Sequence, residues 1–174
     1  MLSRFTDPAR RALIRAGTLS LEARRPTLDP DLVLLALAET RPFDLESFIS
    51  TPESIRALVN TGRDSELLAT LGIDADEIRR RARQTLPDRW RLTRTRLLRV
   101  TLHGPIGSIP LAAHSRKVIE VAMWKPGPVT GERLLWGLLA DFANGAARLL
   151  TQTGTDLRAL VSEAGIPVHR SRAS

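Results

Sequence analysis

A helix is predicted to begin in the stretch Phe5-Thr6-Asp7-Pro8-Ala9-Arg10-Arg11-Ala12-Leu13, and the pattern returns 106 positions later in Leu111-Ala112-Ala113-His114-Ser115-Arg116-Lys117-Val118-Ile119. A second pair of similar stretches, residues 67–74 and 149–156, is separated by 82 positions. A shared pattern with a changing offset indicates common helices joined by loops of unequal length. Such units usually stack because neither buries its apolar face alone. The sequence therefore predicts two unequal copies of one helical unit, over residues 5–78 and 111–160.

The predicted fold is all-α, a pseudo-twofold tandem repeat of two four-helix-like units that form a single domain over residues 1–174. Alternation with a period of two is nearly absent, which favours helices over strands. The expected divisions are repeat one at 5–85, a basic linker at 86–110, repeat two at 111–165 and a frayed tail at 166–174. Four residues of the linker suit either a short strand or a helical turn: Leu97, Leu98, Val100 and Leu102.

Proline and capping residues mark the helix starts of the first copy. Pro8 and Pro30 each stand in a first helical turn, where a missing N–H costs nothing. The predicted helices of the first copy cover residues 7–24, 30 onward, 52–58, 65–71 and 74 onward. Those of the second copy cover residues 112–124, 131–141, 143–153 and 156–164. Residues 41–63 have no counterpart in the second copy.

The composition limits the classes of protein to which the chain can belong. The chain has 174 residues, of which 43% are hydrophobic, enough to build one packed core. The sequence has no cysteine, which excludes disulfides and thiolate chemistry. No apolar run approaches the roughly 20 residues of a membrane span, and the N-terminus lacks a secretory signal. We therefore expect a cytoplasmic protein that does not associate with membranes.

The net charge of +7 is concentrated in one window of the sequence. Residues 79–99 contain a single acid, Asp88, while the rest of the chain is close to neutral. The basic character therefore belongs to the connection between the repeats. The arginines of this window are Arg79, Arg80, Arg81, Arg83, Arg89, Arg91, Arg94, Arg96 and Arg99.

Three stretches of the chain carry a family pattern. Residues 4–11 read Arg-Phe-Thr-Asp-Pro-Ala-Arg-Arg, residues 129–139 contain Thr-Gly-Glu-Arg-Leu-Leu-Trp-Gly-Leu-Leu, and residues 144–157 run from Asn-Gly-Ala-Ala to Gly-Thr-Asp-Leu. They resemble the R-F-T-x-x-A-R-R start, the G-T-E-H-L-L-x-G-L-L helix and the following G-V-A-A segment of the N-terminal domain of Clp ATPases of the ClpA and ClpC type. That domain is itself a tandem repeat. The resemblance implies its fold and its role in binding proteins and peptides.

The chain departs from that family in several places. No G-x-x-x-x-G-K-S/T loop is present to cradle nucleotide phosphates, so we do not expect the ATPase activity. The chain looks like a free-standing Clp N-domain-like protein of actinobacteria, without the ATPase modules. In the first copy the T-E-H position of the family reads Pro30-Asp31-Leu32, and the linker is longer and more basic than the family's.

The resemblance implies a phosphoarginine-type site made by a threonine and the Glu of T-E-H. The first copy offers Thr6 and Asp31, and the second offers Ala112 and Glu132. An acid suits this position because a carboxylate can hold a guanidinium through paired hydrogen bonds. The alternative is that Asp31 and Glu132 only stabilise helix N-termini through the helix dipole. If the site functions, Asp31→Ala is expected to abolish phosphoarginine binding.

The resemblance also implies a surface for partner proteins and cyclic peptides, formed by the N-terminus and the two first helices. Leu2 and Leu111 replace aromatic residues of the family and supply less stacking area. For Ile14 and Leu111, ordinary packing between the repeats is the alternative. The matching positions are Leu2, Arg10, Ile14, Leu111, Arg116 and Glu120.

The arginine run suits the phosphates of a nucleic acid, with Trp90 as one accompanying aromatic residue. The same charges would attract an acidic partner protein, and charge runs also occur as solvated helix faces. The candidate residues are Arg79, Arg80, Arg83, Arg89, Arg91, Arg94, Arg96 and Arg99.

The sequence carries no recognisable signal for catalysis or metal binding. His103, His114 and His169 lie in different segments without the H-x-x-x-H spacing that places two imidazoles on one helix face. No G-x-S-x-G elbow is present. We therefore predict no catalytic residues, no cofactor and no metal, and expect Trp124 and Trp136 to fill the core.

The leading hypothesis is a non-catalytic protein- or peptide-interaction module. It would bind degradation substrates, adaptors or Clp components such as a full-length Clp ATPase, and act as a decoy or modulator of Clp-dependent proteolysis. The alternative is a nucleic-acid-binding regulator that uses the central arginine-rich segment.

Overall fold

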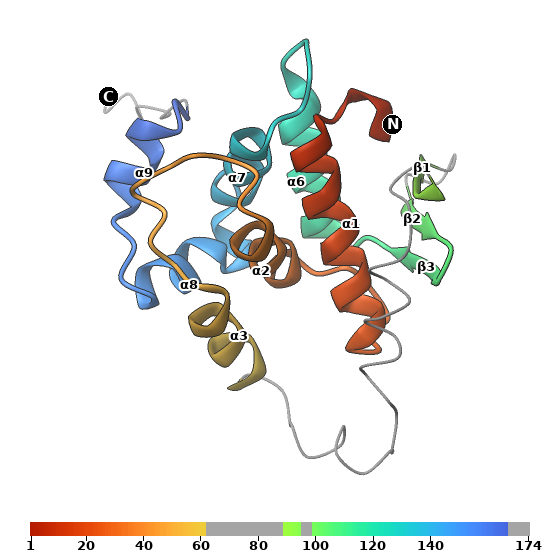
Figure 1. Ribbon diagram of the computed structural model, residues 1–174, viewed down its shortest axis with the longest axis horizontal. Coiled ribbons are helices and arrows are strands. Elements are labelled where there is room, and N and C mark those ends of the chain that lie inside the picture. The colour runs from red at the N-terminus through yellow and green to blue at the C-terminus, as the bar shows by residue number, and fades with distance from the viewer. Residues whose placement is uncertain (62–88, 95–98, 167–174) are drawn as a thin grey trace, which may run out of the picture.

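A computed structural model describes residues 1–61, 89–94 and 99–166, in which helices surround a central buried helix and a small sheet lies at one side (Figure 1). Four helices form the middle of the molecule: α1 (Asp7–Glu22), α2 (Pro30–Thr40), α6 (Ala113–Trp124) and α7 (Gly131–Leu139). The remaining helical elements are η1 (Leu2–Arg4), α3 (Pro52–Thr61), η3 (Phe142–Asn144), α8 (Ala146–Gln152) and α9 (Leu157–Glu163). The helices predicted at 65–71 and from 74 onward, and the tail after residue 166, lie outside the described residues.

The helix starts follow the predicted local signals. The Thr6 side chain caps α1 by accepting a hydrogen bond from the Ala9 N–H, with Pro8 in the first turn. Pro30 and Pro52 likewise begin α2 and α3. These starts are confirmed, as are the helices predicted near 112–124, 131–141 and 156–164. The predicted helix 143–153 divides into η3 and α8 at Gly145, whose φ of 78° breaks the run.

Helix α2 lies at the centre of the core. Pro30 and every residue from Leu32 to Ala38 are buried, so the helix has almost no solvent face. It contacts α1, α6 and α7 from different sides, and it also meets α3 and α8. A helix that is apolar on most sides is expected to be enclosed in this way.

Two short backbone bridges tie the halves of the molecule together reciprocally. Phe5, two residues before α1, forms a parallel bridge with Val129, two residues before α7. Leu28, two residues before α2, forms the equivalent bridge with Leu111, two residues before α6. The hydrogen bonds correspond as well, since Thr6 donates its N–H to the Val129 carbonyl at 2.9 Å and Ala112 donates to the Leu28 carbonyl at 3.1 Å. The start of α1 is therefore held beside the start of α7, and the start of α2 beside that of α6.

The prediction of an all-α fold is wrong, because the linker forms a three-stranded antiparallel sheet. The strands are β1 (Arg91–Arg94), β2 (Val100–Gly104) and β3 (Gly107–Pro110), in the order β1-β2-β3. Leu92, Leu102 and Ile109 pair across the sheet and are buried, so period-two alternation is present but confined to strands of four or five residues. Pro105 and Ile106 form the turn between paired Gly104 and Gly107. The open choice between strand and helical turn is settled as strand for Val100 and Leu102, while Leu97 and Leu98 lie outside the described residues.

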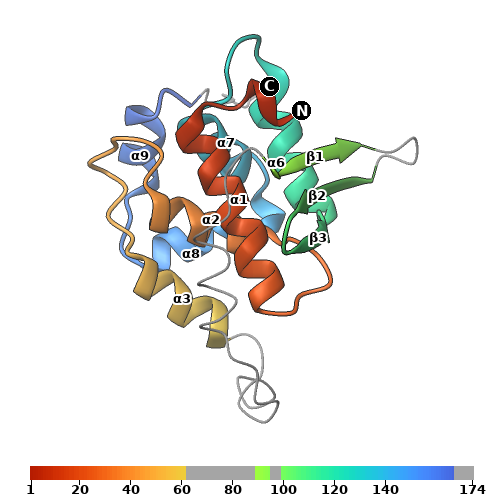
Figure 2. The ribbon, with the colours of Figure 1, turned by 45° about the vertical axis from the view of Figure 1, so that its right-hand side comes forward.

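The sheet lies beside α1 (Figure 2). Glycines allow close packing in this region. A Cβ atom added at Gly17 would lie 2.4 Å from the Leu102 Cδ2 atom, and one added at Gly104 would lie 2.5 Å from the Trp90 ring. Trp90 is only 4% exposed and belongs to the core. The prediction that Trp90 accompanies the arginines as a nucleic-acid contact is therefore not supported by its position.

The segment after α2 is hydrogen-bonded to the C-terminal helices of the described chain. The Glu163 carboxylate of α9 accepts hydrogen bonds from the N–H groups of Glu46 and Ser47, at 2.7 and 2.8 Å. Hydrogen bonding, from the Ser47 side chain foremost, lowers the pKa of Glu163. The Ser50 hydroxyl lies 2.7 Å from that of Thr155. Residues 41–61 thus connect α2 to α8 and α9 and are not a detached insertion.

Within the described ranges, no helix combines the length and the apolar character needed to cross a membrane.

Candidate functional site

Asp31 is already paired within the chain. Nη1 of Arg25 lies 2.8 and 2.7 Å from the two carboxylate oxygens of Asp31, and 3.3 Å from Asp29. The Arg25 side chain is only 10% exposed, so it is held against the protein. The acid that the sequence offers for a guanidinium ligand therefore binds a guanidinium of its own chain.

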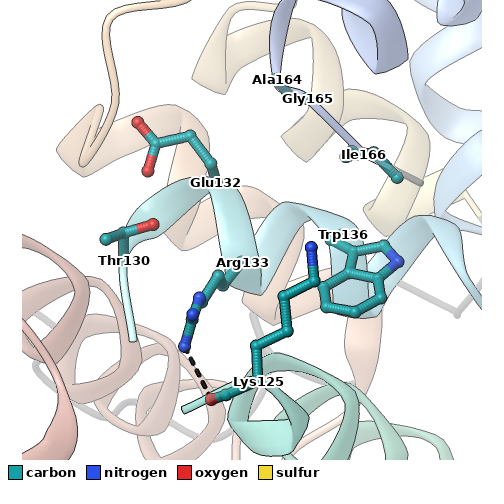
Figure 3. A pocket seen from close by; sticks show the side chains of 8 residues that line it. All are labelled: Lys125, Thr130, Glu132, Arg133, Trp136, Ala164, Gly165 and Ile166. Carbon is teal, nitrogen blue, oxygen red and sulfur yellow. Dashed lines mark hydrogen bonds between the residues drawn. The ribbon is translucent and has the colours of Figure 1, made fainter. Parts of the chain in front are cut away.

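Glu132 occupies the same place on α7 as Asp31 does on α2, the second residue of the helix. It is half-buried, and no hydrogen bond or ion pair joins its carboxylate to any other described residue. It borders a pocket of about 310 Å³ (Figure 3). The lining residues are Lys125, Thr130, Glu132, Arg133, Trp136, Ala164, Gly165 and Ile166. Glu132 therefore lies at the edge of a hollow between α7 and the end of α9, with its carboxylate turned away from Lys125, Arg133 and Trp136.

The structure regroups the predicted phosphoarginine residues. The Thr6 hydroxyl donates to the Val129 carbonyl at 3.3 Å, which holds Thr6 beside the start of α7 and near Glu132. Asp31 instead lies at the other bridge, beside Ala112 and the start of α6. The sequence grouped Thr6 and Asp31 because both belong to the first copy. In the structure they lie at different bridges, because each bridge joins one segment of the first half to one of the second.

Lys125, Arg133 and the single aromatic ring of Trp136 line the other side of the pocket from Glu132. The Lys125 ammonium lies 5.3 Å from the centre of the Trp136 ring, and in Figure 3 the Glu132 carboxylate points away from both Lys125 and Arg133. Arg133 donates to the carbonyls of Lys125 and Pro126 at 3.0 and 2.8 Å, which fixes the loop before α7. Within the described residues, neither cation pairs with a carboxylate.

The expectation that Trp124 and Trp136 fill the core is wrong. Trp124 is 75% exposed, and Trp136 is half-buried at the pocket. Their ring centres lie 6.1 Å apart in a tilted arrangement. The signal that could have found them is the position of Trp124 at the last turn of α6, directly before Lys-Pro-Gly-Pro, where the chain leaves the core.

The predicted partner surface is largely occupied by packing within the chain. Leu2 is buried in the core, and Leu111 takes part in the bridge with Leu28. Ile14 is half-buried and packs against the core, one turn before Gly17, where the sheet sits. Arg10 pairs with Asp7 at 3.0 Å, and Arg116 lies 3.7 Å from Glu120. Leu2 is therefore fully accounted for by packing, while Ile14 and Leu111 are half-buried and pack against the core.

The arginine run is described only in part. Arg89, Arg91, Arg94 and Arg99 are all exposed on or beside the sheet. Arg79, Arg80, Arg83 and Arg96 lie outside the described residues. The part that can be placed is therefore the basic sheet and not a helix face.

A second polar cluster joins α6 to the loop after α7. Nδ1 of His114 lies 2.8 Å from Oδ2 of Asp141, and the Lys117 ammonium lies 3.5 Å from Oδ1. The hydrogen bond with His114 lowers the pKa of Asp141, helped by the Ala143 N–H and the Lys117 charge and opposed by burial. No group of three potential metal ligands occurs among the described residues.

Asp141→Asn is expected to reduce the loss of unfolding free energy that occurs as the pH falls into the acid range. Folded Asp141 keeps its charge at pH values where the unfolded chain binds a proton, so its contribution is present at neutral pH. That contribution is lost as the pH falls below about 4 and through the lowered pKa. Urea unfolding between about pH 5 and pH 3 should show a steeper loss of stability in the unmutated protein than in the variant. Asp44→Asn, at an exposed carboxylate, is the control and should keep the steep profile; equal profiles for the unmutated protein and Asp141→Asn would contradict the assignment.

The pocket at Glu132 combines three features that suit a planar cation carrying an anionic group. A carboxylate can accept paired hydrogen bonds from a guanidinium, aromatic faces can stack against it, and Lys125 and Arg133 can balance negative charge. No protein-family model matches this sequence, and no curated protein matches it.

Proposed function

We propose that the chain is a peptide-recognition module, similar in role to the N-terminal domain of Clp ATPases. The pocket beside α7 would receive an arginine-type side chain of a bound peptide. Phosphoarginine is the ligand that would engage both the Glu132 carboxylate and the cations of Lys125 and Arg133. One observation carries the proposal: the Glu132 carboxylate has no partner among the described residues, whereas the equivalent Asp31 is held by Arg25. Arg25 thus serves as an internal example of the ligand group that the Glu132 site would accept.

The surroundings of Glu132 support binding of a peptide over binding of a small cation alone. Trp124 offers a largely exposed ring beside the pocket, and such rings are favoured anchors at protein interfaces. Lys125 and Arg133 lie on the side away from the carboxylate, where the phosphate of a phosphoarginine would sit. The acid would hold the guanidinium end while the two cations hold the phosphate.

In this proposal the biological partners are degradation substrates, adaptors or a full-length Clp ATPase, and the chain modulates Clp-dependent proteolysis without catalysis of its own. Affinity capture from cells with the unmutated protein and with Glu132→Gln tests this. Clp components or phosphoarginine-bearing proteins should be recovered with the unmutated protein and lost with the variant. Recovery of neither with the unmutated protein would count against this role.

Glu132→Gln is expected to weaken binding of a phosphoarginine-containing pentapeptide at least tenfold, a loss of about 1.4 kcal/mol. Glutamine keeps the length of the side chain but removes the charge that a guanidinium requires. Isothermal titration calorimetry measures the effect, with the matching unphosphorylated arginine peptide as a second ligand.

Asp31→Asn is the matched control for Glu132→Gln. It removes the same charge from the equivalent helix position, but that carboxylate is already engaged with Arg25, so peptide affinity should stay within about twofold. Equal losses in both variants would indicate a general electrostatic effect. The opposite order, with Asp31 essential and Glu132 dispensable, would overturn the assignment of the site.

A further inference from the structure

The outer face of the sheet is mostly polar and basic. The residues that alternate with the buried ones along the strands are Arg91, Thr93, Thr101, His103, Ser108 and Pro110. The described residues 89–94 and 99–110 contain no acid at all. Among the described residues Arg89 and Arg91 have no carboxylate partner, and exposed cations of this kind attract anions.

His103 is fixed at the centre of this face. Its Nε2 lies 2.9 Å from the Thr93 hydroxyl, and its Nδ1 lies 2.8 Å from the Ser108 hydroxyl. A neutral imidazole has one N–H donor and one acceptor nitrogen, so one hydroxyl accepts from the ring while the other donates to it. The accepting hydroxyl keeps its own hydrogen free in either tautomer. The trio therefore presents a hydrogen-bond donor to solvent in addition to the arginines.

A hollow of about 540 Å³ lies beside His103, lined by Arg89, Arg91, His103, Gly104 and Pro105. Arg91 is the cross-strand partner of His103, so the two side chains emerge next to each other on the same face. The Trp90 ring lies directly beneath Gly104 and leaves no space for a side chain at that position. Gly104 therefore lines the hollow with its backbone. The hollow is thus supported from below by a buried aromatic residue.

We propose that this hollow is a binding site for an oxyanion of the phosphate class. The two guanidinium groups of Arg89 and Arg91 can each pair with two phosphate oxygens, and the hydroxyl beside His103 can donate to a further one. Because Trp90 is buried and residues 89–94 and 99–110 contain no phenylalanine, tyrosine or second tryptophan, recognition rests on charge and hydrogen bonds to the phosphate and not on stacking against a large aromatic face. The site is separate from the Glu132 pocket, since the sheet and α9 lie at opposite sides of the molecule (Figures 1 and 2).

Calorimetric titration with inorganic phosphate at low ionic strength tests the proposal. Arg91→Gln and His103→Ala should each weaken phosphate binding about tenfold. Both side chains reach the outer face of the sheet, so neither substitution opens the core. Circular dichroism would verify that the variants keep the fold. Absence of phosphate binding at millimolar concentrations in the unmutated protein would overturn the proposal.

Arg148→Gln supplies the matched control, because it removes the same charge from an exposed position on α8, on the side of the molecule away from the sheet (Figures 1 and 2). Its phosphate affinity should stay within about twofold of the unmutated value. Equal weakening by Arg148→Gln and Arg91→Gln would mean diffuse attraction to net charge and would also overturn the site.

A second ligand, a single-stranded oligonucleotide of about twelve residues, distinguishes two possible sources of the phosphate, a polynucleotide and a small phosphorylated molecule. If the site serves a polynucleotide, the oligonucleotide binds much more tightly than inorganic phosphate, and its affinity falls steeply as salt rises. If the site serves a small phosphorylated molecule, the oligonucleotide binds no more tightly than phosphate. In both cases Arg91→Gln must weaken the complex, and retention of full affinity in that variant would refute the assignment.

Discussion

Gly137→Ala is expected to destabilise the protein by about 3 kcal/mol, although glycine to alanine in an open helix position normally stabilises by about 0.5–1 kcal/mol. The added Cβ would lie 2.3 Å from the Val118 carbonyl oxygen and 3.0 Å from two other backbone atoms of the same residue. Backbone atoms within a helix cannot rotate away as a flexible side chain can, so α6 and α7 would have to separate. Urea denaturation followed by circular dichroism measures the change in unfolding free energy.

Gly127→Ala is the control for this expectation. The new methyl group would meet nothing within 4 Å, and the cost arises only from the φ of +93° that glycine adopts there. A loss of about 1 kcal/mol is expected from that backbone strain. If Gly127→Ala costs as much as Gly137→Ala, the close contact between α6 and α7 is not what makes Gly137 necessary.

Trp90→Ala is expected to cost about 3–5 kcal/mol of stability, the range for truncating a large buried aromatic side chain. Trp90 lies beneath Gly104, contacts the region of Gly17 on α1 and is 4% exposed. Its removal would leave a cavity between the sheet and the helices. Thermal and urea unfolding should both report the loss.

Trp124→Ala is the counterpart on the surface. At 75% exposure this side chain buries little area, so its truncation should change stability by no more than about 0.5 kcal/mol. Comparable losses in the two tryptophan variants would contradict the burial that separates them. The pair also tests the burial of the two tryptophans against the sequence-based expectation, which placed Trp124 in the core and Trp90 at the surface.

Local signals in the sequence predict most of the described helices correctly. Proline in the first turn begins α1 and α2, and at α1 the Thr6 side chain also caps the helix; both signals act within one turn of backbone. The burial of α2 also follows from its own composition, because Val33, Leu34 and Leu35 leave no polar face. These features could be predicted because neighbouring residues determine them.

The sheet could not be predicted in the same way. Its strands are short, and β1 is rich in arginine, so the alternation of Leu92 with Arg91 and Thr93 covers too few residues to separate it from a charged loop. Strand pairing also depends on partners elsewhere in the chain, such as Leu102 for Leu92. The Gly-Pro-Ile-Gly turn was visible in the sequence, but a turn alone does not specify that its flanks pair.

The sequence names candidate residues for the site, but it does not indicate which of them contact one another. Similar stretches identify Asp31 and Glu132 as equivalents, but nothing in the sequence indicates that Arg25 occupies one and leaves the other open. The association of Thr6 with the start of α7 depends on a bridge to Val129, and local similarity carries no information on it.

The bridge before α1 also has a consequence for biosynthesis. The Thr6 hydroxyl and its acceptor on Val129 are 123 residues apart along the chain, so the first segment leaves the ribosome long before its partner exists. At about 5–20 residues per second, that interval is roughly 6 to 25 s. During it the backbone around Phe5 has no native neighbour to pair with. Native assembly must therefore wait until the segment around Val129 has been synthesised.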